Sequence, residues 1–117
     1  MKKDNVIKEK SYKFAVRIVR LSQMLCSGRS EYVLSKQVLR SGTAIGELVR
    51  ESEHAQSKAD FIHKMSIALK EANESDYWLM LLKDTGYIDI PSYTSIQNDV
   101  DELISILVRI IKTAKKN

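Results

Sequence analysis

The sequence predicts an all-α protein in which four helices form an antiparallel up-down-up-down bundle. The chain has 117 residues, within the usual size of one domain, and only four Gly and one Pro interrupt it. Apolar residues recur at alternating spacings of three and four, as they do along one face of a helix. Short connections between such helices favour antiparallel packing of sequential neighbours. We therefore expect one domain over residues 1–117, with helices at about 5–26, 30–52, 58–85 and 91–115.

The first two helices are predicted from their apolar seams and from the residues at their ends. Gly28 follows the 5–26 segment and can take the left-handed conformation that closes a helix. Ser30 can cap the 30–52 segment, because a serine oxygen accepts a hydrogen bond from an unpaired amide of the first turn. The seam residues are Ile7, Phe14, Ile18, Leu21 and Leu25, with Val19 widening the stripe, and then Leu34, Val38, Ser41, Ile45 and Leu48.

The last two helices show the same spacing and clearer boundaries. Ser57 and Asp60 form a capping arrangement ahead of the 58–85 helix, and Gly86 ends that helix. Pro91 suits the first turn of the 91–115 helix, where its missing donor is harmless. The seam residues are Phe61, Met65, Ala68, Ala72, Ser75, Leu79 and Leu82, and then Ile96, Val100, Leu103, Leu107, Ile110 and Ala114.

Composition excludes several classes of protein. Hydrophobic residues make up 44% of the chain and charged residues 29%, which indicates neither a disordered nor a membrane protein. The first residues do not resemble an export signal, and no run of 18 apolar residues occurs. We therefore expect a cytoplasmic protein without a membrane partner. The lone Cys26 cannot form an internal disulfide and is expected to be a small buried hydrophobe.

An apolar turn in the 58–85 helix predicts a contact beyond the bundle. Residues 77–82 are all apolar or aromatic, and at 100° per residue they surround the helix. Because a bundle covers only one side, the outward members Tyr77, Met80 and Leu81 must lie exposed or under another subunit. We expect an oligomer interface here. The alternative is that the connection 87–93 of the same chain folds over these side chains.

Two glycines inside the 30–52 helix are further candidates for a close contact. Gly42 and Gly46 each cost about 1 kcal/mol relative to alanine, so something should compensate. Small residues allow another backbone to approach closely. We place both glycines in the candidate oligomer interface, with the first or the third helix of the same chain as the alternative neighbours.

Basic residues are concentrated on the first helix. Residues 1–26 hold seven Lys or Arg against two acids, whereas residues 27–117 hold twelve against thirteen. In an up-down-up-down bundle the last helix ends beside the start of the first, which predicts an electropositive end. Such surfaces bind phosphate backbones, and a solvated basic face is the alternative. The candidate nucleic-acid-binding residues are Lys3, Lys10, Lys13, Arg17 and Arg20 along one stripe, and Lys112, Lys115 and Lys116 at the end.

Catalytic and metal-binding patterns are weak. Glu51 with His54, and Asp60 with His63, stand one helical turn apart, as in carboxylate-bridged dimetal bundles. However, the seams of the first and last helices hold no acid that could complete such a site. No Gly-rich phosphate loop, Cys pair or nucleophile elbow is present. We therefore expect a non-enzymatic protein with no catalytic residue, no metal and no cofactor.

The second and third helices carry a specific family resemblance. The stretches 39–46, 55–74, 77–79 and 85–88 closely resemble the bacterial four helix bundle protein family. That family is also called the 23S rRNA intervening-sequence protein or ribosomal S23-type family. The resemblance covers about residues 10–110. The chain departs from the family pattern after Gly46, with Arg50 where the family has alanine.

The resemblance implies the subunit of a ring-shaped homo-oligomer, a homopentamer. The chain is similar also to the accessory protein of diversity-generating retroelements, which binds nucleic acid and a reverse transcriptase. We therefore expect a non-enzymatic accessory protein that assembles with itself and binds RNA or DNA. The alternative is a protein–protein interaction adaptor of unknown partner that binds no nucleic acid. The candidate protein partners are a reverse transcriptase, which the resemblance implies, or another protein.

Overall fold

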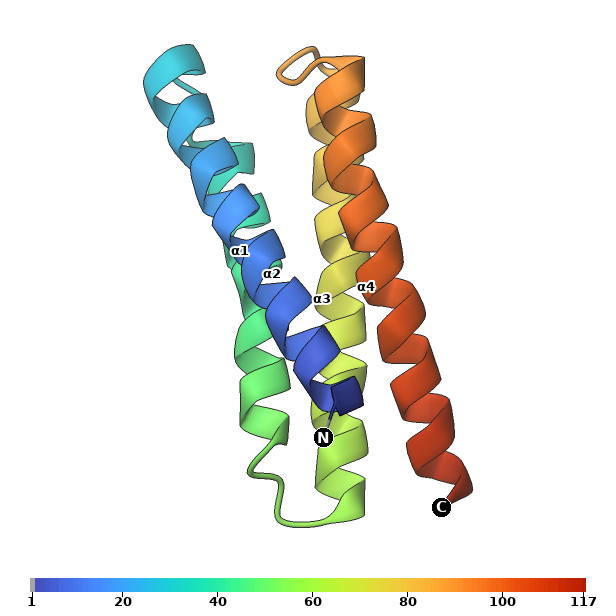
Figure 1. Cartoon of the computed structure of the whole chain (residues 1–117). Coiled ribbons are helices and arrows are strands. Elements are labelled where there is room, and N and C mark those ends of the chain that lie inside the picture. Colours follow the sequence, from blue (N-terminus) through green and yellow to red (C-terminus); the bar gives the residue numbers. More distant parts are fainter. Residues whose placement is uncertain (1) are drawn as a thin grey trace.

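Four helices and their connections make up the computed structural model, which describes residues 2–117 and the side chains of residues 6–117. The helices are α1 (Lys2–Arg29), α2 (Val33–Ser52), α3 (Lys58–Asp84) and α4 (Ile90–Lys116). Each helix runs antiparallel to the one before it, so α1 starts and α4 ends at the same end of the bundle (Figure 1). No strand occurs within residues 2–117. The predicted all-α fold with four helices is confirmed.

The boundaries of α3 and α4 follow from local hydrogen bonds. The Ser57 Oγ accepts a hydrogen bond from the Asp60 amide at 3.0 Å, which confirms the predicted cap of α3. Gly86 has a φ of 85°, and the Tyr87 amide donates to the Leu82 oxygen at 2.9 Å, as in a Schellman motif. Pro91 lies in the first turn of α4, as predicted. The Asp89 carboxylate forms an additional cap, since it accepts a hydrogen bond from the Ser92 amide at 2.8 Å. This hydrogen bond stabilises the ionised carboxylate and lowers the pKa of Asp89.

The turn between α1 and α2 differs from the sequence prediction. Helix α1 continues past Gly28 to Arg29, and Ser30, not Gly28, takes the left-handed conformation, with a φ of 52°. Ser30 therefore does not cap α2. Glu31 does so instead: its buried carboxylate accepts hydrogen bonds from three amides of the first turn, at 2.7 to 3.2 Å. The longer Glu side chain reaches forward along the chain to amides that the displaced Ser30 does not satisfy.

The core consists of the predicted seams, with corrections at the edges. Most seam residues are buried, including Phe14, Ile18, Leu79 and Leu107. Val19 is 39% exposed and does not widen the core. Toward the end of α4, Ile111 is buried in the core, whereas the predicted Ile110 is only half-buried. The other seam residues that prove half-buried are Leu21, Leu34, Leu48, Phe61 and Ala114.

The four neighbouring helix pairs are not packed equally. The pairs α1–α2, α2–α3 and α3–α4 are in close contact, whereas α1 and α4 approach each other least. Small polar residues lie within the close pairs: the Oγ atoms of Ser22 and Ser35 are 2.7 Å apart, and those of Ser41 and Ser75 2.9 Å apart. The bundle thus has one loosely closed side, between α1 and α4.

None of the described helices is long and apolar enough to cross a lipid bilayer.

Candidate nucleic-acid interface and oligomer surfaces

Two members of the predicted basic stripe on α1 face α4. The Lys10 Nζ lies 3.1 Å from a carboxylate oxygen of Glu102. Arg17 lies 2.7 Å from Asp99 and also donates to the Ser95 Oγ at 3.2 Å. These ion pairs bridge the loosely closed side of the bundle. Much of the charge of Lys10 and Arg17 is therefore compensated by acids of the same chain.

The remaining described residues of the stripe, Lys13 and Arg20, are exposed and form no ion pair with α4. Lys13 lies 3.7 Å from Glu9 on the same helix, and both side chains are largely exposed, so this pair contributes little stability. Arg20 is exposed on the outer face of α1. Lys3 belongs to residues 1–5, whose side chains lie outside the described part of the structure. The outward part of the stripe thus consists of Lys13 and Arg20.

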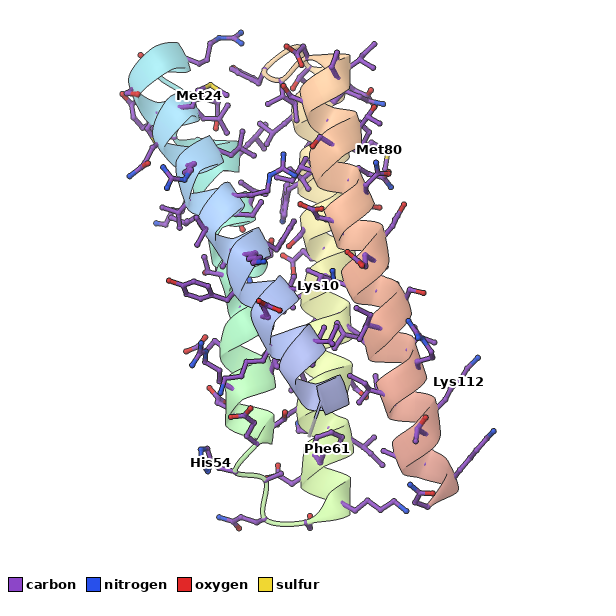
Figure 2. All side chains as sticks on the ribbon, viewed as in Figure 1. Lys10, Met24, His54, Phe61, Met80 and Lys112 are labelled. Carbon is purple, nitrogen blue, oxygen red and sulfur yellow. The ribbon has the colours of Figure 1, made fainter. Side chains whose placement is uncertain are left out.

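The basic end of the bundle combines residues of two helices. Lys112, Lys115 and Lys116 are exposed on the last turns of α4, and Figure 2 shows Lys112 extending away from the bundle. Within residues 6–117 none of the three forms an ion pair. Arg109, one turn earlier on α4, and Lys58, at the start of α3, are exposed at the same end. Sequence reasoning missed Arg109 and Lys58, although the antiparallel topology that placed the three lysines also places them here.

The two candidate interface glycines lie inside the bundle. A Cβ atom on Gly42 would lie 2.8 Å from the Cγ1 atom of Ile18, and one on Gly46 would lie 3.5 Å from the backbone oxygen of Ser11. Ile18 and Ser11 both belong to α1. The helix that approaches these glycines is therefore α1 of the same chain, and this corrects their assignment to a contact between subunits.

The apolar turn on α3 remains uncovered by the part of the chain that the structure describes. Tyr77 is 56% exposed and Met80 41% exposed, while Leu81 is half-buried. The connection before α4 does not fold over Tyr77 and Met80. Its Tyr87 packs against the guanidinium of Arg29. Because large apolar side chains at a shared surface commonly mark contacts with other proteins, Tyr77 and Met80 remain candidates for an interface.

A second exposed apolar surface lies on α1, and sequence reasoning missed it. Tyr12 is 58% exposed, and a shallow groove of about 350 Å³ on this face is lined by Tyr12, Ala15, Val16, Val19, Arg20 and Gln23. The Arg50 guanidinium of α2 lies 5.9 Å from the centre of the Tyr12 ring. The sequence does carry a signal for this surface, namely the apolar residues of α1 that lie outside its seam. Interface candidates therefore occur on two sides of the bundle.

One carboxylate lies in an unfavourable environment between α3 and α4. Burial raises the pKa of Asp76, and the nearby charge of Asp101 raises it further, while a hydrogen bond with Gln97 acts in the opposite direction. Its Oδ1 atom is buried without a hydrogen-bond partner among the described residues. In residues 6–117, His, Cys, Asp and Glu side chains form no group of three or more that could hold a metal ion.

These features define a class of protein: a small antiparallel helical bundle with one basic end and separate exposed apolar surfaces. The sequence profile of the 23S rRNA-intervening sequence protein family matches residues 3–109. The chain therefore belongs to this family, as the resemblance of its second and third helices predicts.

A solved structure agrees with this assignment. A protein with unknown function from the S23 ribosomal protein family of Bacteroides thetaiotaomicron is 58% identical in sequence to this chain. Its crystal structure matches with a TM-score of 0.93, and the match covers 94% of this chain and 98% of that one. The comparison with curated proteins gives no match. The family recognition made from the sequence is thereby confirmed.

Proposed function

We propose that this protein is a non-enzymatic, homo-oligomeric accessory protein that binds the phosphate backbone of RNA or DNA through the basic end of its bundle. The observation that carries the proposal is the exposed group Lys112, Lys115 and Lys116, which has no carboxylate partner within residues 6–117. Each lysine that neutralises a phosphate releases counterions, and this release drives binding without sequence preference.

The basic end is a better binding surface than the stripe on α1. Lys10 and Arg17 would have to leave Glu102 and Asp99 before they could contact phosphates. Within residues 6–117, the lysines of α4 have no carboxylate partner that they would have to leave. Lys13 and Arg20 point outward and can contribute secondary contacts if a nucleic acid extends along α1.

Self-assembly would strengthen this binding. The proposed assembly is a homopentamer, the arrangement that the family resemblance implies. Exposed apolar side chains on α1 and α3, including Tyr12 and Tyr77, support burial between subunits. Several basic ends in one particle would multiply the electrostatic field that attracts a polyanion.

Three double variants with the same change in net charge test the binding surface. Lys112→Gln with Lys116→Gln removes charge from the basic end, and Lys13→Gln with Arg20→Gln removes it from the outward stripe. The matched control, on exposed residues of α2 and α3, is Lys36→Gln with Lys70→Gln. Affinity for duplex RNA and duplex DNA is measured at several salt concentrations.

The basic-end variant should lower the slope of log K against log salt by about two, one for each lost phosphate contact. The control should change that slope much less. Equal losses in all three variants would mean that only net charge matters and would contradict a specific basic end. Light scattering tests assembly separately, because a mass equal to one 13.4 kDa chain at micromolar concentration would contradict the homo-oligomer.

A second candidate function is a protein-interaction adaptor, which the exposed side chains of Tyr77 and Met80 favour. The two functions differ in their response to nuclease. Specific capture of one protein that persists after nuclease treatment, together with no affinity for duplex RNA or DNA, would favour the adaptor.

A further inference from the structure

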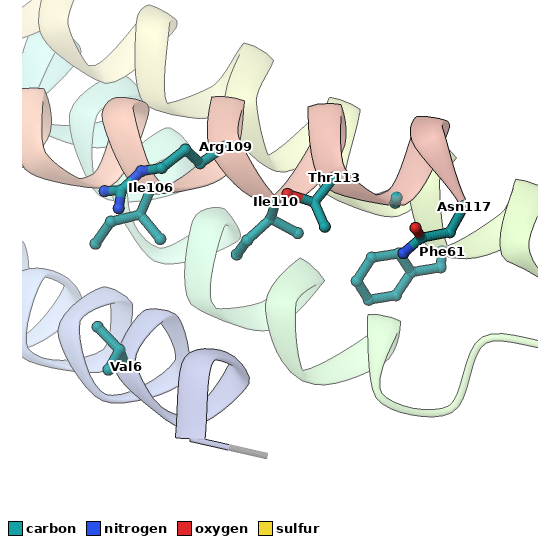
Figure 3. Close-up of a pocket in the computed structure, with 8 residues that line it drawn as sticks. Val6, Phe61, Ile106, Arg109, Ile110, Thr113 and Asn117 are labelled. Carbon is teal, nitrogen blue, oxygen red and sulfur yellow. The ribbon is translucent and has the colours of Figure 1, made fainter.

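The loosely closed side of the bundle contains an apolar groove near the basic end. It measures about 400 Å³ and is lined by Val6, Phe61, Ile106, Arg109, Ile110, Thr113, Ala114 and Asn117. Figure 3 shows α4 forming one wall, Val6 of α1 lying opposite, and Phe61 of α3 at one end. The groove therefore follows the second half of α4.

The groove exists because α4 carries more apolar surface than the core uses. Leu103, Leu107 and Ile111 are buried in the core. Ile106 and Ile110 are only half-buried and face the groove. On the opposite wall, α1 contributes Val6, which is itself 41% exposed. This side of α4 is thus an apolar stripe with turn-by-turn spacing that no helix of the described chain covers.

Charge at the groove is one-sided. Residues 103–117 hold four cations, Arg109, Lys112, Lys115 and Lys116, and no acid. Arg109 lines the groove directly, and in Figure 3 its guanidinium lies beside Ile106. On α1, Lys8 is paired with Glu53 and Lys10 with Glu102. The local excess of positive charge therefore comes from the α4 wall.

Size and shape restrict the occupant. A groove of about 400 Å³ is within the range of sites that bury a small ligand or the anchor side chains of one helix face. Its elongation along α4 suits apolar residues at i, i+3, i+4 and i+7 of an added helix. Acidic residues beside those anchors would meet Arg109, the charged residue of the groove lining, and residues 103–117 hold no acid that would repel them, which gives complementary potentials.

We propose that this groove binds an acidic amphipathic helix of a partner protein, which packs between α1 and α4 with its carboxylates toward Arg109. The site is distinct from phosphate binding, because it requires the apolar floor as well as the charge. It deepens the second candidate function, the protein-interaction adaptor, by naming its binding surface and the chemistry of its partner.

The test uses synthetic helices as probes of the whole protein. The acidic probe carries leucines at i, i+3, i+4 and i+7 flanked by glutamates, and two controls carry lysines in place of the glutamates or the same residues in scrambled order. Fluorescence anisotropy should show that the acidic probe binds at least about tenfold more tightly than either control, a difference of about 1.4 kcal/mol. Equal binding of the scrambled probe would overturn the proposal.

Variants then locate the binding. Val6→Glu and Ile110→Glu should each weaken the acidic probe about tenfold or more, because both place a carboxylate in the groove. Val33→Glu is the matched control, since Val33 is 72% exposed at the far end of the bundle and the charge change is the same. If Ile110→Glu unfolds, the exposed Val6 position carries the test. Unchanged affinity in Val6→Glu would overturn the groove assignment.

Two further measurements distinguish helix binding in the groove from phosphate binding and from self-association. Ile110→Ala should weaken the acidic probe while leaving affinity for duplex RNA within about twofold, because it removes no charge. If Ile110→Ala weakened the binding of the acidic probe and of duplex RNA to the same extent, the groove and the phosphate-binding surface would be one site, and the proposal would be overturned. Probe binding that occurs only at dilutions where light scattering reports a monomer would assign the groove to a second copy of the chain and likewise overturn the proposal.

Discussion

Gly42 offers the most direct test of how α1 and α2 pack. An alanine at this position would place its Cβ 2.8 and 2.9 Å from the Cγ1 and Cγ2 atoms of Ile18 and 3.2 Å from its Cβ. Ile18 is fully buried and β-branched, so its side chain cannot rotate away. The Cβ contact also involves an atom fixed to the backbone. Relief therefore requires a shift of α1 itself.

The expected magnitude follows from a comparison with Gly46. Both glycines lie in α2, and replacing either by alanine gains about 1 kcal/mol of intrinsic helix propensity. At Gly46 the new Cβ would make an ordinary 3.5 Å contact with the Ser11 oxygen, so Gly46→Ala should stabilise the protein. At Gly42 overpacking costs about 1–3 kcal/mol in addition. The two variants should therefore differ in free energy of unfolding by about 1–3 kcal/mol, with Gly42→Ala the less stable.

Urea denaturation followed by circular dichroism measures this difference, at one protein concentration so that any self-association affects all samples alike. Ile18→Ala provides the internal control, because it removes the clashing Cγ atoms and leaves only the 3.2 Å contact with the Cβ atom, so Gly42→Ala should cost much less in the Ile18→Ala background than in the parent. Equal stabilisation by Gly42→Ala and Gly46→Ala would refute the packing described. A change in assembly mass instead of stability would return the glycines to a subunit contact.

Three further predictions concern single side chains. Glu31→Ala removes the carboxylate that caps α2 and should lower the free energy of unfolding by about 1–2 kcal/mol, with faster hydrogen exchange in the first turn of α2; unchanged exchange would exclude the cap. Burial raises the pKa of Asp76 above its ordinary 3.8, and Asp101 raises it further, so the ionised form destabilises the fold at neutral pH and this penalty vanishes as pH falls to 3.8. Asp76→Asn should therefore be more stable than the parent at pH 7 and lose this advantage in acid, whereas a pH-independent difference would contradict the assignment. Arg17→Gln breaks the half-exposed pair with Asp99 and should cost less than about 1 kcal/mol at low salt and almost nothing near 1 M salt; a loss that salt does not reduce would indicate packing, not charge.

The sequence predicts those features that depend on a few neighbouring residues. Helical periodicity places Phe14 and Leu107 in the core, because a seam repeats within each helix. The Ser57 cap and the Gly86 terminus are equally local. Between Gly28 and Glu31 the local signals compete, and the sequence favours the wrong cap because several residues there can end or start a helix.

Features that depend on the register between distant helices are not predictable in this way. Arg17 and Asp99 meet only because α1 and α4 are neighbours, although 82 positions separate them in the chain. The sequence shows that α4 contains acids, but nothing in the neighbouring residues indicates that they lie on the face of α4 that is turned toward α1. The same holds for Ile110 and Ile111, since both fit an apolar seam and only the packed bundle decides which one enters the core.

The candidate nucleic-acid interface also has one part that the sequence predicts and one part that it does not. The position of the basic end follows from topology alone, because antiparallel order brings the start of α3, with Lys58, to the same end as the last turns of α4 whatever the register. The availability of the stripe depends on which α1 cations find acids on α4. Sequence reasoning therefore located the end correctly in space but could not identify Lys10 and Arg17 as internally paired.

A residue-resolved footprint of bound nucleic acid tests the central proposal most directly. Amide shifts or hydrogen exchange are recorded for the intact protein with and without a short RNA duplex at low salt. We expect the largest changes in residues 109–116 of α4 and at the start of α3, and smaller changes at Lys13 and Arg20 of α1. A footprint confined to Lys13 and Arg20, or no change at any residue at saturating duplex, would contradict it.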